Sequence, residues 1–202
     1  MSARPVELFF DPICPWAWMT SRWLLSAAEV REIAPTFSIM SLAALNEGRD
    51  LDEDYRKHMD EAWGPARLAL AVEKAGGQED LAAFYTAWGE TFHVGGNKEN
   101  PGAAEAGLEK AGLDASLISA LEDESLDDEL RARQKAVVEL VGDEVGTPVI
   151  SFGEGVAYFG PVISPAPKGE EAGVLFDGLE AMSRVSSFFE LKRSRTTGPV
   201  FD

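Results

Sequence analysis

The only cysteine of the chain, Cys14, lies where a strand-like run meets a helix-like run. The strand-like run covers residues 6–10, and the helix-like run covers residues 18–30. Pro15 follows the cysteine directly, and proline suits the first position of a helix because it needs no N–H partner there and its φ is already helical. The sequence therefore predicts a strand, a tight turn and a helix whose N-cap is Cys14.

A cysteine in that position is predicted to carry a reactive thiol. The free N–H groups of the first helical turn and the helix dipole favour a negative charge on the sulfur. An ordinary thiol has a pKa of about 8.5, and helix N-termini lower it to about 3.5–7.5 in Cys-x-x-Cys contexts. The alternative is a structural cysteine buried as a small apolar side chain. The adjoining strand, proline and helix favour the reactive interpretation.

The place of a second cysteine in a Cys-x-x-Cys pair is occupied by Ala17. A disulfide formed by Cys14 with another molecule therefore cannot be resolved within the chain. This restricts the predicted chemistry to exchange through a single thiol.

Composition and charge narrow the classes of partner. The chain has 202 residues and a formal net charge of −17, from 35 acidic and 18 basic residues. Such a surface repels phosphate backbones and anionic lipids, so we expect neither nucleic-acid nor membrane binding. No apolar stretch approaches the ~20 residues that span a bilayer, and residues 1–5 lack the apolar part of a signal peptide. A lone cysteine also excludes an intramolecular disulfide framework, so we expect a cytoplasmic protein.

The order of the remaining patterns predicts an α/β fold. Alternation over residues 36–42 predicts a second strand, and a crossover helix would place it parallel to the first. Residues 146–152 and 156–160 enclose a Gly-x-Gly turn and predict an antiparallel hairpin. A last helix is expected over residues 169–183. The predicted order is βαβ, a helical insertion, then ββα.

The helical insertion is expected over residues 46–143. Apolar stripes at helical spacing recur through it, with breaks expected at Gly64-Pro65 and at Gly76-Gly77. The predicted division of the chain is therefore one α/β domain, built from residues 1–45 and 144–202, interrupted by an all-helical subdomain.

Several short stretches, in fixed order, carry a family resemblance. They are residues 10–16 (FDPICPW), 20–23 (TSRW), 40–43 (MSLA), 45–47 (LNE), 63–65 (WGP), 145–148 (VGTP), 159–162 (FGPV) and 188–193 (FFELKR). Together they resemble the DsbA-like family of thioredoxin-fold oxidoreductases, and more closely its actinobacterial mycothiol-dependent nitroreductase and reductase group. The resemblance covers nearly the whole chain. Cys-Pro by itself is a weak signal, whereas the ordered set is specific.

The resemblance implies a thioredoxin fold and a thiol–disulfide reductase whose electrons come from the low-molecular-weight thiol mycothiol. Some members of the group also reduce nitro compounds. The related chains carry a cysteine where this chain has Ala17, so an internal dithiol cycle is not expected here.

The resemblance also implies the surroundings of the thiol. The active-site motif is Cys14, Pro15, Trp16 and Ala17, with Trp16 as a packing wall. In thioredoxin folds the proline that opens the strand opposite the cysteine is cis, and its preceding backbone can bind an extended substrate. Pro148, with Thr147 before it, is expected to fill that place, although base rates for X–Pro bonds favour trans.

Three further residues are candidates for contact with the thiol or its substrate. Asn46 follows the second strand and is expected either to donate a hydrogen bond to mycothiol or to serve as a turn residue. Tyr55 is expected to cover the thiol or, slightly preferred, to pack in the core. His93 is a candidate proton donor, and a helix C-terminal histidine is at least as good an interpretation. We expect His58 on a solvent face, and the basic residues 192, 193 and 195 in a solvated tail.

The predicted reaction is a monothiol exchange between mycothiol and mycothiolated proteins or small disulfides. We expect no bound cofactor and no metal, because the chain lacks a cluster of ligating side chains. The sequence leaves open whether the protein is a monomer or a homodimer. Two alternatives remain: a glutathione-transferase-like or isomerase-like enzyme that activates a bound thiol, and a non-catalytic peptide-binding or chaperone protein.

Overall fold

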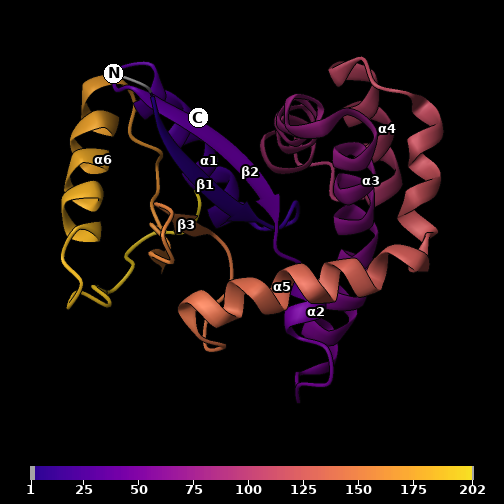
Figure 1. Cartoon of the computed structure of the whole chain (residues 1–202). Helices are drawn as coiled ribbons and strands as arrows, with labels where there is room; N and C mark the ends of the chain where they lie inside the picture. The colour runs from indigo at the N-terminus through magenta and orange to yellow at the C-terminus, as the bar shows by residue number, and fades with distance from the viewer. Residues whose placement is uncertain (1–2, 202) are drawn as a thin grey trace.

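A computed structural model describes residues 3–201 and shows a mixed four-stranded sheet in the order β2-β1-β3-β4 (Figure 1). Strands β1 (Arg4–Phe10) and β2 (Ile33–Ile39) are parallel and are joined by helix α1 (Pro15–Ala28). Strand β3 (Val149–Ser151) pairs antiparallel with β1, and β4 (Ala157–Phe159) pairs antiparallel with β3. The predicted α/β fold, with its βαβ unit and its hairpin, is confirmed.

The second strand starts and ends three residues before the predicted range of 36–42. Pro35 lies inside the strand and pairs with Val6, which is tolerated because β2 is an edge strand. Ser41 instead caps the short helix α2 (Leu42–Leu45), and its hydroxyl accepts the Ala44 N–H at 3.2 Å. The prediction started the strand after Pro35, because a proline that follows a helix usually marks the end of that helix. The local sequence did not indicate that this proline lies inside the strand.

The residues between the two halves of the sheet are helical, as predicted. The elements are α3 (Glu53–Gly89), the π-helical turn η1 (Glu90–Val94), α4 (Asn100–Ala111), the 3₁₀ segments η2 (Ala115–Glu122) and η3 (Glu124–Leu126), and α5 (Asp127–Val141). The final helix, α6 (Gly169–Ser183), has the predicted bounds and flanks the sheet on the side away from α3 and α4 (Figure 1). None of the helices in the described part of the chain is both long and apolar enough to cross a membrane.

The break predicted at Gly64-Pro65 is wrong, because helix α3 continues through it. Pro65 leaves the Glu61 carbonyl without its intrahelical donor, and the Asn100 side-chain amide donates to that carbonyl instead, at 2.8 Å. Gly64 allows close packing, since a Cβ there would lie 3.2 Å from the Leu121 carbonyl oxygen. The second predicted break is confirmed: Gly77 interrupts the helix with a φ of 76°.

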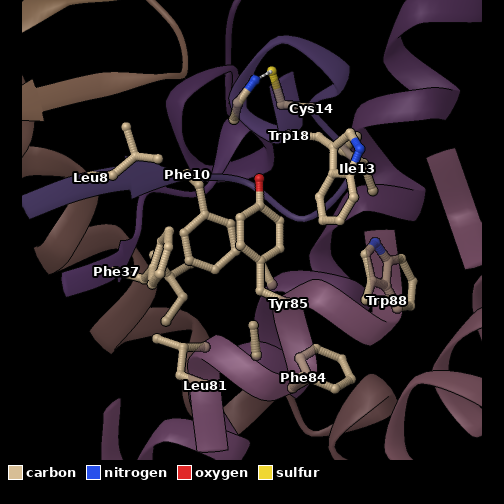
Figure 2. Packing of buried hydrophobic residues seen from close by; sticks show 14 of the residues in the cluster. Leu8, Phe10, Ile13, Cys14, Trp18, Phe37, Leu81, Phe84, Tyr85 and Trp88 are labelled. Atoms are coloured by element: carbon tan, nitrogen blue, oxygen red, sulfur yellow. Dashed lines mark hydrogen bonds between the residues drawn. The ribbon is translucent and has the colours of Figure 1, made fainter. Parts of the chain in front are cut away.

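One buried cluster joins the sheet to the helical segment. The rings of Phe10 on β1 and Tyr85 on α3 stack with centroids 3.8 Å apart (Figure 2). Helix α3 also approaches α1 closely, because a Cβ at Gly89 would lie 2.1 Å from the Trp18 ring. The active-site end of α1 is therefore held between the sheet and the helical segment. On the opposite face of the sheet, Val149 packs with Val137 of α5 in a second, smaller cluster.

Candidate active site

Cys14 is the N-cap of helix α1, as predicted. Its backbone is extended, with φ −76° and ψ 113°, and its sulfur accepts the Ala17 N–H at 3.4 Å (Figure 2). The Cys14 N–H donates to the Asp11 carbonyl at 3.0 Å, which closes the turn after β1. Pro15 occupies the first helical turn. The Ala17 N–H thus donates to the sulfur, while the Ala17 methyl group is fully buried.

The loop before β3 faces the thiol. The Cys14 S–H donates to the Thr147 carbonyl at 3.3 Å, and the Thr147–Pro148 peptide bond is cis. The Thr147 hydroxyl is buried and has no hydrogen-bond partner among the described residues. The sulfur therefore lies between the first turn of α1 and the Thr147 carbonyl. An incoming chain that donates an N–H to this carbonyl would compete with the Cys14 S–H for it.

Burial controls the titration of the thiol in this closed site. Cys14 is only 5% exposed, and this burial raises its pKa above that of an ordinary thiol. The Ala17 N–H acts in the opposite direction, and the nearby Asp11 carboxylate raises the Cys14 pKa further. The prediction of a lowered pKa is therefore wrong for the closed state, because loss of solvent outweighs the helix terminus.

Asp11 is a site residue that sequence reasoning missed. Its side chain is fully buried and accepts two main-chain N–H groups, from Ile13 at 3.0 Å and from Leu42 at 2.7 Å. It therefore ties the Cys14 turn to the start of α2. Burial raises the pKa of Asp11 to about 7. An Asp whose carboxylate can accept the N–H two residues later is a recognisable turn signal, and the Asp-Pro-x-Cys stretch contains it.

His93 supports the active-site turn from the helical segment. Its Nε2 lies 2.9 Å from the Pro12 carbonyl, and the Trp88 indole N–H donates to the same oxygen at 3.0 Å. Burial lowers the pKa of His93 to about 4, so the ring is neutral near pH 7. Its Nε2 is engaged with the backbone, while its Nδ1 is buried and has no hydrogen-bond partner among the described residues, so a role as a proton donor stays a prediction. His93 lies in the π-helical turn η1 and, through the Pro12 carbonyl, helps to hold the active-site turn in place.

Asn46 and Tyr55 have different environments. Asn46 is buried at the end of α2, where its amide donates to the Leu42 carbonyl at 2.9 Å and contacts the Met59 sulfur at 3.5 Å. Asn46 is the C-cap of α2, which fits the turn interpretation, and a hydrogen bond to mycothiol stays a prediction. Tyr55 is 40% exposed, so the preferred core interpretation is wrong. Burial raises its pKa, and the charges of Cys14 and Asp11 raise it further.

The C-terminal tail reaches the site. The guanidinium of Arg195 lies over the half-buried Trp16 ring, 5.1 Å from its centroid, and the Phe201 ring lies 5.8 Å from that of His93. Residues 191–198 are exposed, so the expectation of a solvated tail is confirmed, and Arg195 makes its contact with Trp16 from an exposed position. Trp16 packs, partly buried, against the core cluster that contains Cys14, and its role as a wall of the site stays a prediction.

A pocket of ≈ 450 Å³ opens beside the Cys14 turn, between Ile13 and Pro15 and the helical segment. Its lining comprises Ile13, Pro15, His58, Glu61, Ala62, Phe92, Lys98 and Asn100. His58 is exposed, as predicted, and lies at this opening. Residues 3–201 contain no grouping of His, Cys, Asp and Glu side chains that could hold a metal ion.

The model of one protein family, described as Rv2466c-like, mycothiol-dependent nitroreductase Rv2466c, matches residues 13–193. The chain belongs to the Rv2466c-like family. The match begins one residue before Cys14 and includes the Thr147–Pro148 loop, so it contains both sides of the site. The predicted relationship to DsbA-like thioredoxin-fold oxidoreductases is confirmed. Membership supports thiol–disulfide oxidoreductase chemistry at this site.

Individual proteins are also similar to this Rv2466c-like chain. An uncharacterised protein, Rv2286c of Mycobacterium tuberculosis, is 27% identical over 197 residues, which are 96% of this chain and 84% of that protein. A solved 2-hydroxychromene-2-carboxylate isomerase superposes with a TM-score of 0.55 at 18% identity, over 90% of this chain and 95% of that one. Salmonella enterica serovar Typhimurium DsbL gives a TM-score of 0.41 at 16% identity, over 88% of each chain. The isomerase similarity shows the shared fold alone.

Proposed function

We propose that the protein reduces mixed disulfides of mycothiol through a monothiol cycle at Cys14. The observation that carries this proposal is the combination of Cys14 at the N-cap of α1 with a fully buried Ala17 where a second thiol would stand. Membership of a family described as mycothiol-dependent supports mycothiol as the co-substrate. The proposed substrates are mycothiolated proteins and small disulfides, and the proposed compartment is a reducing cytoplasm.

The cycle has two exchange steps. In the first, the Cys14 thiolate attacks the mycothiol sulfur of a mixed disulfide; a Cys14–mycothiol disulfide forms, and the substrate leaves as a thiolate with the electron pair of the broken bond. In the second, the thiolate of another mycothiol attacks that adduct, mycothiol disulfide forms, and Cys14 leaves as a thiolate. Each turnover consumes one mycothiol thiolate, whose sulfur is oxidised to the disulfide level, while the sulfur of the substrate is reduced to a thiolate. Neither step needs a bound metal or flavin.

The closed site explains how a buried thiol enters this cycle. A disulfide that reaches Cys14 must displace the hydrogen bond from the sulfur to the Thr147 carbonyl. The Thr147 carbonyl is then available to accept an N–H of the incoming molecule. Extended peptides bind to an exposed main chain in this way, through strand-like hydrogen bonds. The Ala17 N–H remains directed at the sulfur and stabilises the thiolate form as the site is resolvated.

Intact mass spectrometry tests the cycle directly. The protein is incubated with mycothiol disulfide, and its mass is recorded before and after addition of reduced mycothiol. We expect one mycothiol adduct, absent in Cys14→Ser, that the reduced thiol removes. If Cys14 reacts with a small alkylating agent but never with mycothiol disulfide, the proposal is overturned and an isomerase-like or peptide-binding function becomes the better one.

A further inference from the structure

The pocket beside Cys14 has a floor and a rim of different chemistry. Its floor is apolar and comprises Ile13, Pro15, Ala62 and Phe92. Ile13 and Pro15 are the sequence neighbours of Cys14, so the pocket lies against the turn that carries the thiol. The rim carries polar side chains from α3 and from the segment before α4, among them Glu61 and Lys98.

Lys98 is a cation without a counter-charge. Its ammonium lies 4.2 Å from the centroid of the Phe92 ring, which fixes it over the pocket floor. It forms no ion pair with any residue from 3 to 201. Although the side chain is largely exposed, partial desolvation lowers its pKa. An anion bound against Phe92 would compensate both effects.

The other charged residue of the rim does not cancel this cation. Glu61 lies in helix α3 beside Lys57, whose ammonium is 4.0 Å from its carboxylate. Its side chain is 58% exposed and turns towards solvent at that pair. The first turn of α4 begins at Asn100 on the same rim, and the positive end of that helix has the same sign as Lys98. With Glu61 facing Lys57, Lys98 is the charge of the lining that is available to an anion.

We propose that this pocket is the subsite for the leaving half of the mixed disulfide, and that it selects an aromatic or aliphatic thiol bearing a carboxylate held by Lys98. The proposal rests on the proposed function and adds the substrate class. Mycothiol itself is an amide-linked sugar thiol without a carboxylate, so it gains nothing from Lys98. The subsite therefore distinguishes the two sulfurs of the disulfide and directs which half Cys14 keeps.

Two matched model disulfides test this selectivity. The symmetric disulfides of para-mercaptobenzoate and para-mercaptobenzamide have nearly the same shape, and only the first is anionic. Single-turnover release of the aryl thiolate is followed by absorbance without mycothiol, so that only attack by Cys14 is measured. In Lys98→Gln we expect the ratio of the anionic to the neutral rate constant to fall about fivefold, as for loss of a partly exposed ion pair.

Two further variants separate local from global effects. Lys135→Gln removes the same charge from an exposed position on α5 and should leave the ratio unchanged, whereas Lys98→Arg should retain it. Raising the salt concentration should lower the ratio in the native protein but not in Lys98→Gln. An unchanged ratio in Lys98→Gln, or an equal fall in Lys135→Gln, overturns the subsite. Failure of Cys14 to attack either disulfide overturns the proposed function instead.

Discussion

The Cys14 sulfur is subject to two opposing influences. The main chain of α1 directs the Ala17 N–H at it, which favours the thiolate, while nearly complete burial favours the thiol. The neighbouring Asp11 carboxylate adds to the second effect. Because desolvation is the larger influence, the closed site holds a protonated thiol hydrogen-bonded to Thr147. Reactivity is thus tied to solvent access.

The pH dependence of alkylation should reveal this balance. We expect the rate of iodoacetamide modification of Cys14 to rise with a midpoint above that of the urea-unfolded chain, because burial raises the folded-state pKa. Each unit of upward shift lowers the thiolate fraction about tenfold below the midpoint. The same shift predicts that stability falls as pH rises through the unfolded thiol pKa of about 8.5, where only the unfolded chain releases its proton. A folded midpoint below the unfolded one would show that the helix terminus dominates.

At single residues, local sequence predicted roles that depend on the next few positions. The cap at Cys14 follows from Pro15 and the adjoining strand, and it is found. Asn46 contacts the Met59 sulfur, and His93 contacts the Pro12 carbonyl. Local sequence patterns do not indicate such contacts, because the partners lie outside the local segment. The same holds for the Cys14 pKa, which is determined by how closely distant segments cover the sulfur.

At the scale of elements, helix α3 shows why two similar glycine-containing pairs behave differently. Gly77 takes a left-handed φ and interrupts the helix, which a glycine does at little cost. Gly64 and Pro65 stay helical, because Asn100 supplies the missing donor to Glu61 and the Leu121 carbonyl packs closely on Gly64. Local sequence could not separate these cases, since the compensating residue lies on another helix.

A double-mutant cycle tests this compensation. Asn100→Ala should lower the free energy of unfolding by about 1 kcal/mol or more, because it leaves the Glu61 carbonyl without a side-chain donor. In a Pro65→Ala background the main-chain N–H regained at that position can take over, so the same substitution should cost much less. Urea denaturation of the four proteins gives the coupling energy. Additive losses would mean that Asn100 stabilises the protein by some other contact.

At the scale of the whole molecule, the helical segment and the sheet share their buried core. Phe10 belongs to β1 and Tyr85 to α3, yet their rings stack at 3.8 Å. Trp18 on α1 packs on both Tyr85 and His93. The division into an α/β domain and a helical subdomain remains a prediction from the chain order. The packing nevertheless indicates that neither part can unfold without exposing the other.

Cooperative unfolding is the expected consequence. Far-ultraviolet circular dichroism and tryptophan fluorescence should give coincident urea transitions. Tyr85→Ala should lower both midpoints together, at a cost of about 3–5 kcal/mol typical for loss of a large buried ring. Val174→Ala, on an exposed position of α6, is the matched control and should change stability by less than about 0.5 kcal/mol. Hydrogen exchange that releases residues 53–141 before the sheet would contradict a shared core.

The buried methyl group of Ala17 has a consequence for the timing of any exchange at Cys14. With no neighbouring sulfur to attack the adduct, the bound half of a disulfide stays until a diffusing thiol arrives. The lifetime of the adduct is then determined by the concentration of free thiol in the surroundings. Most molecules would therefore carry a free Cys14 where thiol is plentiful, and most would carry an adduct where thiol is scarce. The fraction of the protein with an adduct would then report the concentration of reducing thiol around it.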